Sequence, residues 1–265
     1  MEPTLVPLVV GCMMTEEGAG MPFPPRKAMP NKLLALLPTA DYEAIIGETA
    51  HVELPRGTLL AEQGGPIKKV YFLTEGIGSV VVTTAEGKQA EAGIFGFDGY
   101  VPTSAIAGIE NSSYDVVVQV AAKGYEMSYG DFRRWMVENR NFSGIMIRSI
   151  EAFSVQLAYT AVSNAIHEVP QRLARWILMC DDRISGNEIA ITHKFLSIML
   201  GVRRPSVTTS LHVLEGLGLI KAERGVVFIC NRPGLERYAR DAYGWPEREY
   251  SRLMQGFASA ANANL

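Results

Sequence analysis

Cysteine is scarce in this 265-residue sequence, and so are long apolar runs. Cys12, Cys180 and Cys230 are too few and too far apart to form a disulfide framework or a four-thiolate metal cluster. This scarcity favours a reducing compartment, so we expect a cytoplasmic protein. The apolar stretch at residues 5–14 contains a proline and lacks a basic flank, so it predicts neither a signal peptide nor a membrane anchor.

Histidine is scarce as well, with four in the whole sequence. None of them forms a His-x-His pair, so the metal triad of a β-barrel enzyme cannot be assembled from neighbouring residues. His51 is the only histidine in the β-rich half of the chain, which gives haem binding no support. We therefore expect no enzyme: no catalytic residues, no metal ion and no cofactor.

Positive charge is not in excess, because the net charge is −3, and this excludes a protein that binds nucleic acid over its whole surface. The distribution is uneven, however. Residues 1–135 carry ten Lys and Arg against sixteen Asp and Glu, whereas residues 136–265 carry fifteen against twelve. Residues 190–232 hold six basic side chains and two acidic ones. This C-terminal stretch has the local charge that phosphates require.

The N-terminal half reads as an irregular arm followed by a β-rich domain. Residues 1–31 contain six prolines and predict no regular element, and a helical pattern begins only at about Lys32. From residue 51 to residue 129, short β-forming runs alternate with turn signals at Glu75–Gly76 and Glu86–Gly87. This spacing is typical of an antiparallel sandwich or barrel.

A long helix is predicted next. Six residues recur at alternating spacings of four and three, which is the pattern of a heptad seam: Met146, Ile150, Phe153, Leu157, Thr160 and Asn164. Such a seam needs a partner. A second copy of the chain is the partner we favour, and packing against the chain's own β domain is the alternative.

A helix-turn-helix follows at residues 192–214. Thr192 is a suitable N-cap for a short helix, and Gly201 permits the tight turn after it. The second helix buries Val207, Leu211 and Leu214. Two short strands, 220–223 and 226–229, then form a hairpin about Arg224–Gly225, which is the wing of a winged helix.

Nine polar residues of this region are the candidate DNA contacts: Thr192, His193, Arg203, Arg204, Ser206, Thr208, Thr209, His212 and Arg224. Arg204 is the strongest candidate, because the start of a recognition helix meets base edges and the guanidinium fork matches guanine O6 and N7. The alternative is that Arg203 and Arg204 are ordinary solvated charges. The helix dipole disfavours them at a helix start, however, and this cost points to a function.

This constellation, residues 192–214 followed by Leu217–Gly218–Leu219–Ile220, resembles the Crp/Fnr family of bacterial transcription factors. The resemblance covers roughly residues 32–240. It implies an α+β fold made of a double-stranded β-helix of the jelly-roll-like cyclic-nucleotide-binding type, a long dimerisation helix and a C-terminal winged helix-turn-helix. The resemblance implies a β-roll sensor domain (32–135), a dimerisation helix (136–166) and a DNA-binding domain (167–233). The proline-rich start predicts an N-terminal arm (1–31). The apolar residues after Pro233 predict a helical tail (234–265) that packs on the winged helix.

The sequence departs from the family at both functional sites. The family's base-reading Arg-Glu pair and later Arg match Arg204, Pro205 and Thr209, so only the first is retained and the DNA target differs. The family's effector segment corresponds to residues 96–99 and 111–114, and no arginine stands between Arg56 and Arg133 to pair with a cyclic phosphate. We therefore expect no control by cyclic AMP, and the effector is unknown.

The resemblance implies a sequence-specific regulator of transcription. As a homodimer it would bind a pseudo-palindromic site on double-stranded DNA, with RNA polymerase as a further partner and no membrane association. The alternative is a β-roll interaction or ligand-sensing module whose helix-turn-helix no longer reads DNA. Retention of Arg203 and Arg204 argues against that alternative.

Overall fold

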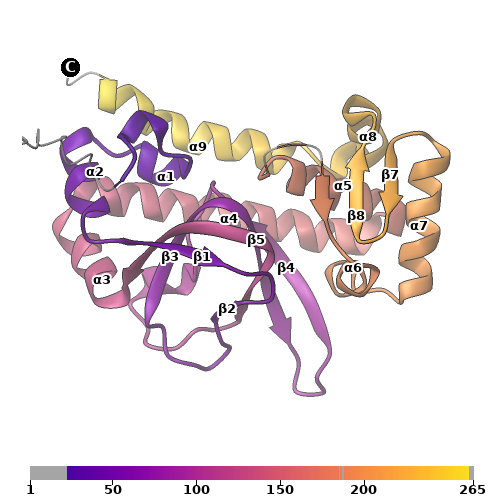
Figure 1. Ribbon diagram of the computed structural model, residues 1–265, viewed down its shortest axis with the longest axis horizontal. Helices are drawn as coiled ribbons and strands as arrows, with labels where there is room; N and C mark the ends of the chain where they lie inside the picture. The colour runs from indigo at the N-terminus through magenta and orange to yellow at the C-terminus, as the bar shows by residue number, and fades with distance from the viewer. Residues whose placement is uncertain (1–22, 185, 187, 263–265) are drawn as a thin grey trace, which may run out of the picture.

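The computed structural model describes residues 23–184, 186 and 188–262, with the side chains of the last helix described as far as residue 255. It confirms the predicted α+β fold class, with two antiparallel sheets joined by a long helix. In Figure 1 this helix, α4 (Arg140–Ile166), runs behind the larger sheet and carries the chain to the smaller sheet near the other end of the molecule.

The larger sheet forms a β-roll. Its strands pair in the order β1-β5-β3-β4, and β2 also pairs with β5; the bounds are β1 (Ala50–Leu54), β2 (Leu59–Ala61), β3 (Lys69–Thr83), β4 (Gln89–Phe95) and β5 (Asp115–Ser128). Because side chains alternate across a strand, one face of each strand points inward. Val80, Phe95 and Val116 meet there in a buried apolar cluster. Side chains therefore fill the interior of the roll.

The predicted turn at Glu75–Gly76 is wrong. Strand β3 continues through these residues and pairs with β5 on both sides of them, with shifts of register between Leu73 and Ile77. Gly76 has φ +84°, and a Cβ there would lie 2.5 Å from the Ala122 Cα. The glycine therefore permits a bulge that bends the strand, where we expected a chain reversal. The second predicted turn, at Glu86–Gly87, does join β3 to β4.

Short helices cover one end of the roll. They are η1 (Arg26–Ala28), α1 (Lys32–Ala35), α2 (Thr39–Ile46), η2 (Thr103–Ala107) and α3 (Tyr129–Glu138). The predicted irregular arm lies mostly outside the described residues. Its last part is anchored, because Asn31 is fully buried and donates from Nδ2 to the carbonyls of Leu73 (2.9 Å) and Gly99 (3.1 Å).

Helix α4 is the long helix that the sequence predicts, but most of the predicted seam packs against the chain itself; only its last member, Asn164, is exposed. Met146 and Ile150 pack in the core beneath α1 and α2, and Phe153 packs on the core of the β-roll. The described chain thus provides the partner for this seam, as in the alternative we left open. The outward face of α4 carries a different row at heptad spacing, and all its members are exposed: Ile147, Glu151, Ser154, Ala158, Ala161 and Ala165.

The smaller sheet belongs to a winged helix. The chain passes through α5 (Val169–Asp181), β6 (Glu188–Ala190), α6 (His193–Leu200), α7 (Arg204–Gly216), β7 (Ile220–Glu223), β8 (Val226–Ile229) and α8 (Arg232–Ala239), and the strands pair in the order β6-β8-β7. Strands β7 and β8 coincide with the predicted wing. Strand β6 is not predicted from the sequence, because its three residues are too few to show a pattern.

The C-terminal tail packs in two places. Helix α8 contributes Leu235 and Ala239 to the core of the winged helix, as predicted for the tail. After η3 (Arg240–Ala242), α9 (Trp245–Asn262) returns to the β-roll and lies along α4 in Figure 1. Its Tyr250 hydroxyl donates to the Asp98 carbonyl (2.9 Å), and Met254 is buried in the core beneath α1 and α2. The prediction that the tail packs on the winged helix is therefore wrong for α9.

Candidate nucleic-acid interface

Helices α6 and α7 form the helix-turn-helix. The Thr192 side chain caps α6 and accepts a hydrogen bond from the Phe195 amide (3.3 Å). Gly201 ends α6 at φ +60°, a left-handed conformation that glycine adopts without strain. The chain can therefore turn at once into α7, whose Val207, Leu211 and Leu214 are buried against the rest of the domain.

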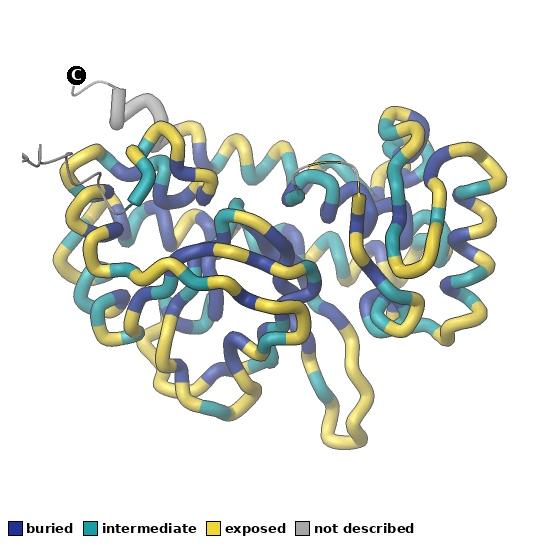
Figure 2. Tube along the Cα trace, in the orientation of Figure 1, coloured by how far each residue is buried: buried dark blue, intermediate teal, exposed yellow. Residues whose placement is uncertain are grey.

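The start of α7 is open to solvent. Arg203 is its N-cap and Arg204 its first residue, and both are exposed. Neither arginine makes an ion pair with any residue that the structure describes. Figure 2 shows exposed positions along the outer side of this helix, at one end of the molecule. Two unpaired guanidinium groups are thus held where they raise the local positive potential at the helix start.

The hydroxyls of α7 are already engaged within the helix. The Thr208 hydroxyl donates to the Arg204 carbonyl (3.3 Å) and the Thr209 hydroxyl to the Pro205 carbonyl (3.1 Å). Such back-bonding uses the one proton that each hydroxyl offers. At Thr209 a nucleic acid would therefore meet oxygen lone pairs and a methyl group, whereas the Thr208 hydroxyl also lies 3.4 Å from His193 Nδ1 of α6. Ser206 and Thr208 are half-buried, whereas Thr209 and His212 are exposed.

A groove between α6, α7 and the wing brings five of the nine candidates together: Thr192, His193, Thr208, His212 and Arg224. Two glutamates also line it, and both have partners. Glu215 accepts from the Ala222 amide (2.7 Å), and Glu223 pairs with Lys221 (2.6 Å). Lys221 thus partly neutralises the Glu223 charge, and the wing tip adds the cation of Arg224. Arg203, Arg204, Ser206 and Thr209 do not line this groove.

The β-roll reaches the same region, a contact that no local sequence signal predicts. Arg56, in the turn between β1 and β2, lies 3.4 Å from the Thr192 hydroxyl at the N-terminus of α6. The tip of the β3–β4 hairpin, at Lys88, shares a shallow depression with Arg203. Two further cations therefore stand beside the helix-turn-helix, although they lie more than a hundred residues from it in the sequence.

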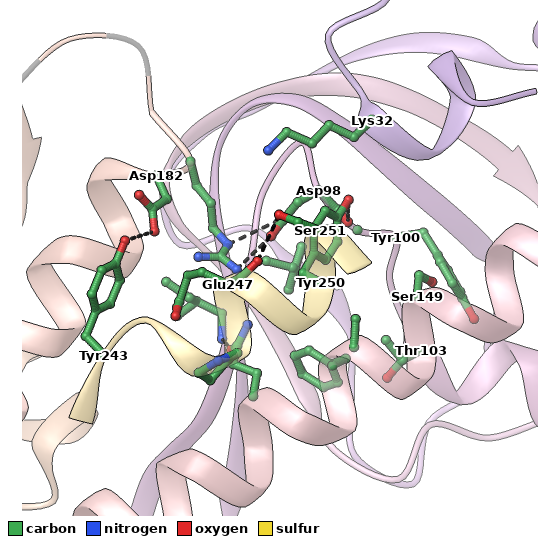
Figure 3. A pocket seen from close by; sticks show the side chains of 18 residues that line it. Lys32, Asp98, Tyr100, Thr103, Ser149, Asp182, Tyr243, Glu247, Tyr250 and Ser251 are labelled. Carbon is green, nitrogen blue, oxygen red and sulfur yellow. Dashed lines mark hydrogen bonds and ion pairs between the residues drawn. The ribbon is translucent and has the colours of Figure 1, made fainter. Parts of the chain in front are cut away.

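A second candidate site is the cavity in Figure 3, of about 230 Å³, between the β-roll, α4, α9 and the end of α5. The ion pair of Asp98 and Arg183 crosses it, with Oδ2 and Nη2 2.6 Å apart. Tyr243 donates to Asp182 (2.7 Å), and burial raises the pKa of this phenol well above its ordinary value. Lys32 enters from α1 and lies over the Phe97 ring. Aromatic and charged groups thus line a space between the two domains.

Other kinds of site find no support in the described part of the chain. No group of three or more His, Cys, Asp or Glu side chains is arranged there to hold a metal ion. None of its helices is both long enough and apolar enough to cross a membrane.

Two family models match the sequence. A cyclic nucleotide-binding domain matches residues 51–139, and a Crp-like helix-turn-helix domain matches residues 171–238. No curated protein matches the sequence.

Three solved structures illustrate the fold. The c-di-GMP responsive global regulator CLP of Xanthomonas campestris is 15% identical with a TM-score of 0.59, over 72% of this chain and 98% of that one. A CRP-family transcriptional regulator from Thermus thermophilus is 18% identical with a TM-score of 0.61, over 71% and 96%. FixK2 from Bradyrhizobium japonicum is 11% identical with a TM-score of 0.62, over 72% and 98%. At these identities the likeness establishes the shared fold.

Proposed function

The chain belongs to the Crp/Fnr family of DNA-binding transcription regulators, and we propose that it binds a pseudo-palindromic site on double-stranded DNA as a homodimer. Helix α7 would enter the major groove, and Arg204 would read a guanine. The wing, through Arg224, would contact the neighbouring phosphates.

The exposed start of α7 carries this proposal. An exposed arginine without a carboxylate partner gains little in the free protein, and it stands at the end of a helix where the dipole opposes its charge. Both costs are offset when the guanidinium meets a guanine edge or a phosphate. The alternative is a module whose helix-turn-helix no longer binds DNA. In that case Arg203 and Arg204 would have no interaction that offsets their unfavourable position at the helix start.

Arg204→Ala tests the base-reading role. DNA sequences bound by the wild-type chain would first be selected from a random library, and affinities for the best site and its single-base variants would then be measured at fixed salt. We expect Arg204→Ala to lose about 1–3 kcal/mol on the best site and to tolerate substitution at one base pair of each half-site. Arg237→Ala, an exposed change of equal charge on α8, is the matched control. Equal weakening by Arg204→Ala on every sequence would contradict base reading.

We place the dimer interface on the outward face of α4. The exposed row of Ile147, Ala158, Ala161 and their neighbours keeps the heptad spacing that two parallel helices need. Its small side chains would allow close approach. Two copies joined along α4 would present two α7 helices to successive turns of a duplex, which is the geometry that a pseudo-palindrome requires.

We also propose that cyclic AMP does not control this chain. Asp98 lies in the segment that corresponds to the family's ribose-binding residues, and its carboxylate is already paired with Arg183 and with the Gly96 amide (3.0 Å). The interior of the roll is packed with apolar side chains and offers no arginine to a phosphate. Cyclic AMP at millimolar concentration should leave the selected DNA affinity unchanged, and a tightening of tenfold or more would contradict this expectation.

A further inference from the structure

We infer that Glu91 positions the winged helix on the β-roll through a hydrogen bond from Trp176, and that this docking weakens as the Glu91 carboxyl loses its proton. Glu91 lies on β4 and is buried at the boundary between the two domains. The Trp176 indole, on α5, donates from Nε1 to Glu91 Oε1 over 2.9 Å. On the other side, Glu91 Oε2 is hydrogen-bonded to the Ser79 hydroxyl of β3.

Besides this contact and the Asp98–Arg183 ion pair, buried apolar packing holds the two domains together. Trp176 is 4% exposed and belongs to one buried cluster that includes Ile94 of the β-roll and Met199 of α6. Apolar contacts are not directional and tolerate sliding. A hydrogen bond between a buried carboxyl and an indole fixes both groups, because either one left without a partner in the interior is costly.

The other groups around Glu91 do not give it a counter-ion. The ionisable groups whose charges act on it are Arg175 and Arg183 at α5 and the Cys180 thiol. Among the described residues Glu91 has no ion pair within 4 Å; Arg175 donates instead to Thr160 of α4 (3.1 Å), and burial lowers its pKa to about 10. From α6, Met199 approaches Ser79 with its sulfur. Helix α4 packs on the same face of β4, at Gly93, with the side chains of Phe153, Gln156 and Leu157, none of which titrates.

Because the Glu91 carboxyl is buried without a counter-ion, the strength of docking depends on pH. Desolvation raises the pKa of Glu91 from 4.5 to about 8, although Ser79 and Trp176 oppose the shift by donating to the charged form. When the domains separate, the carboxyl meets water and its pKa returns toward 4.5. The docked state then binds the proton more tightly, so docking is strongest below pH 4.5 and weakens about tenfold per pH unit up to pH 8. Above pH 8 the dependence flattens, because both states are ionised.

Tryptophan fluorescence can follow this docking without DNA. The full chain with Trp135→Phe and Trp245→Phe leaves Trp176 as the only indole. Its emission should move to longer wavelength when the domains separate. Urea titrations at pH 6, 7 and 8 would give the equilibrium constant for exposing Trp176. We expect this constant to rise about tenfold from pH 6 to pH 7 and about fivefold from pH 7 to pH 8, where the docked carboxyl itself begins to ionise. The matched control is Glu91→Gln, which keeps an acceptor for the indole and cannot ionise, so its constant should change far less.

A companion protein separates positioning from general stability. With Trp176→Phe and Trp245→Phe, the remaining Trp135 reports on α3 at the far side of the β-roll. We expect Trp176 to respond at lower urea than Trp135. Coincident transitions, or equal pH slopes in the wild-type and Glu91→Gln chains, would overturn the inference. The fluorescence measurement does not depend on the proposed function, so a chain that does not bind DNA would still show this pH dependence.

Discussion

The ion pair between Asp98 and Arg183 offers the sharpest test of how the two domains are joined. Arg183 follows α5, and its side chain is 9% exposed. Its Nε lies 3.2 Å from Asp98 Oδ1 and its Nη2 lies 2.6 Å from Oδ2, while Nη1 donates to the Met179 carbonyl (2.8 Å). Desolvation lowers the pKa of the guanidinium, but the charges of Asp98 and Asp182 outweigh it and raise the pKa above its ordinary value. The cation is thus held by this partner.

Breaking the pair from one side should be expensive. Among the described residues, Arg183→Met leaves the Asp98 carboxylate with the Gly96 amide as the only partner of its side chain, and Asp98→Asn leaves a buried guanidinium with no carboxylate within ion-pair distance. Each change should lower the free energy of unfolding by about 3–5 kcal/mol. The double variant removes both charges, so it should cost less than the sum of the single changes by about 2–3 kcal/mol.

Urea unfolding followed by circular dichroism measures all four proteins of this cycle. Met at position 183 keeps much of the volume of the arginine stem, so the coupling reports charge more than lost packing. Additive effects in the double variant would refute the argument, because they would mean that the two groups do not stabilise each other. If each single substitution lowered the free energy of unfolding by less than about 1 kcal/mol, the pair would be no stronger than an ordinary surface salt bridge.

Two further predictions concern the N-terminal anchor and the dimer. Asn31→Ala removes two donated and two accepted hydrogen bonds at a fully buried site, so it should cost about 2–4 kcal/mol in urea unfolding, and a loss below 1 kcal/mol would contradict the anchoring role. Ala158→Glu places like charges on both copies of the proposed α4 interface and should give monomers in sedimentation. Val137→Glu, at an 87% exposed site on α3, should leave the dimer intact, and an unchanged dimer in Ala158→Glu would move the interface elsewhere.

Local signals predicted the winged helix well. Thr192 and Gly201 act through hydrogen bonds and φ angles of their own segments, so their effect can be read without knowing the fold. The wing is equally local, because Gly225 supplies the positive φ that a tight hairpin turn needs between two β-forming runs. The same reasoning failed at Gly76, where a glycine marks a bulge. A bulge and a turn both use positive φ, and only the neighbouring strand decides between them.

The orientation of α4 was beyond the reach of sequence reasoning for another reason. Two rows on one helix carry heptad spacing, and the more apolar row predicted the interface with a second copy. The β-roll is itself apolar, and it takes that row for its own core through Met146 and Phe153. The less apolar row is left outside. Periodicity shows that a helix has a buried face, but the identity of the covering surface depends on contacts between distant residues.

The candidate DNA-binding site was also only partly predictable from the sequence. The sequence placed the nine residues on the right elements, because each element is short and strongly patterned. It could not assign Arg56 or Glu91, since an exposed arginine in a turn and a glutamate in a strand have no local signature of function. Burial gives Glu91 its significance, and burial arises only when the winged helix docks on the roll.

Glu91 and Asp98 together suggest how this docking has a defined orientation. The two carboxyl groups stand seven residues apart, at β4 and just beyond it. Their partners, Trp176 and Arg183, also stand seven residues apart, on α5 and just beyond its end. One polar contact alone would allow the winged helix to rotate about it on the β-roll. A second contact prevents that rotation. The cavity of Figure 3 reaches the Asp98–Arg183 contact but is not lined by Glu91. A molecule entering that cavity would therefore disturb one of the two attachments, and the winged helix could turn about the attachment that remained.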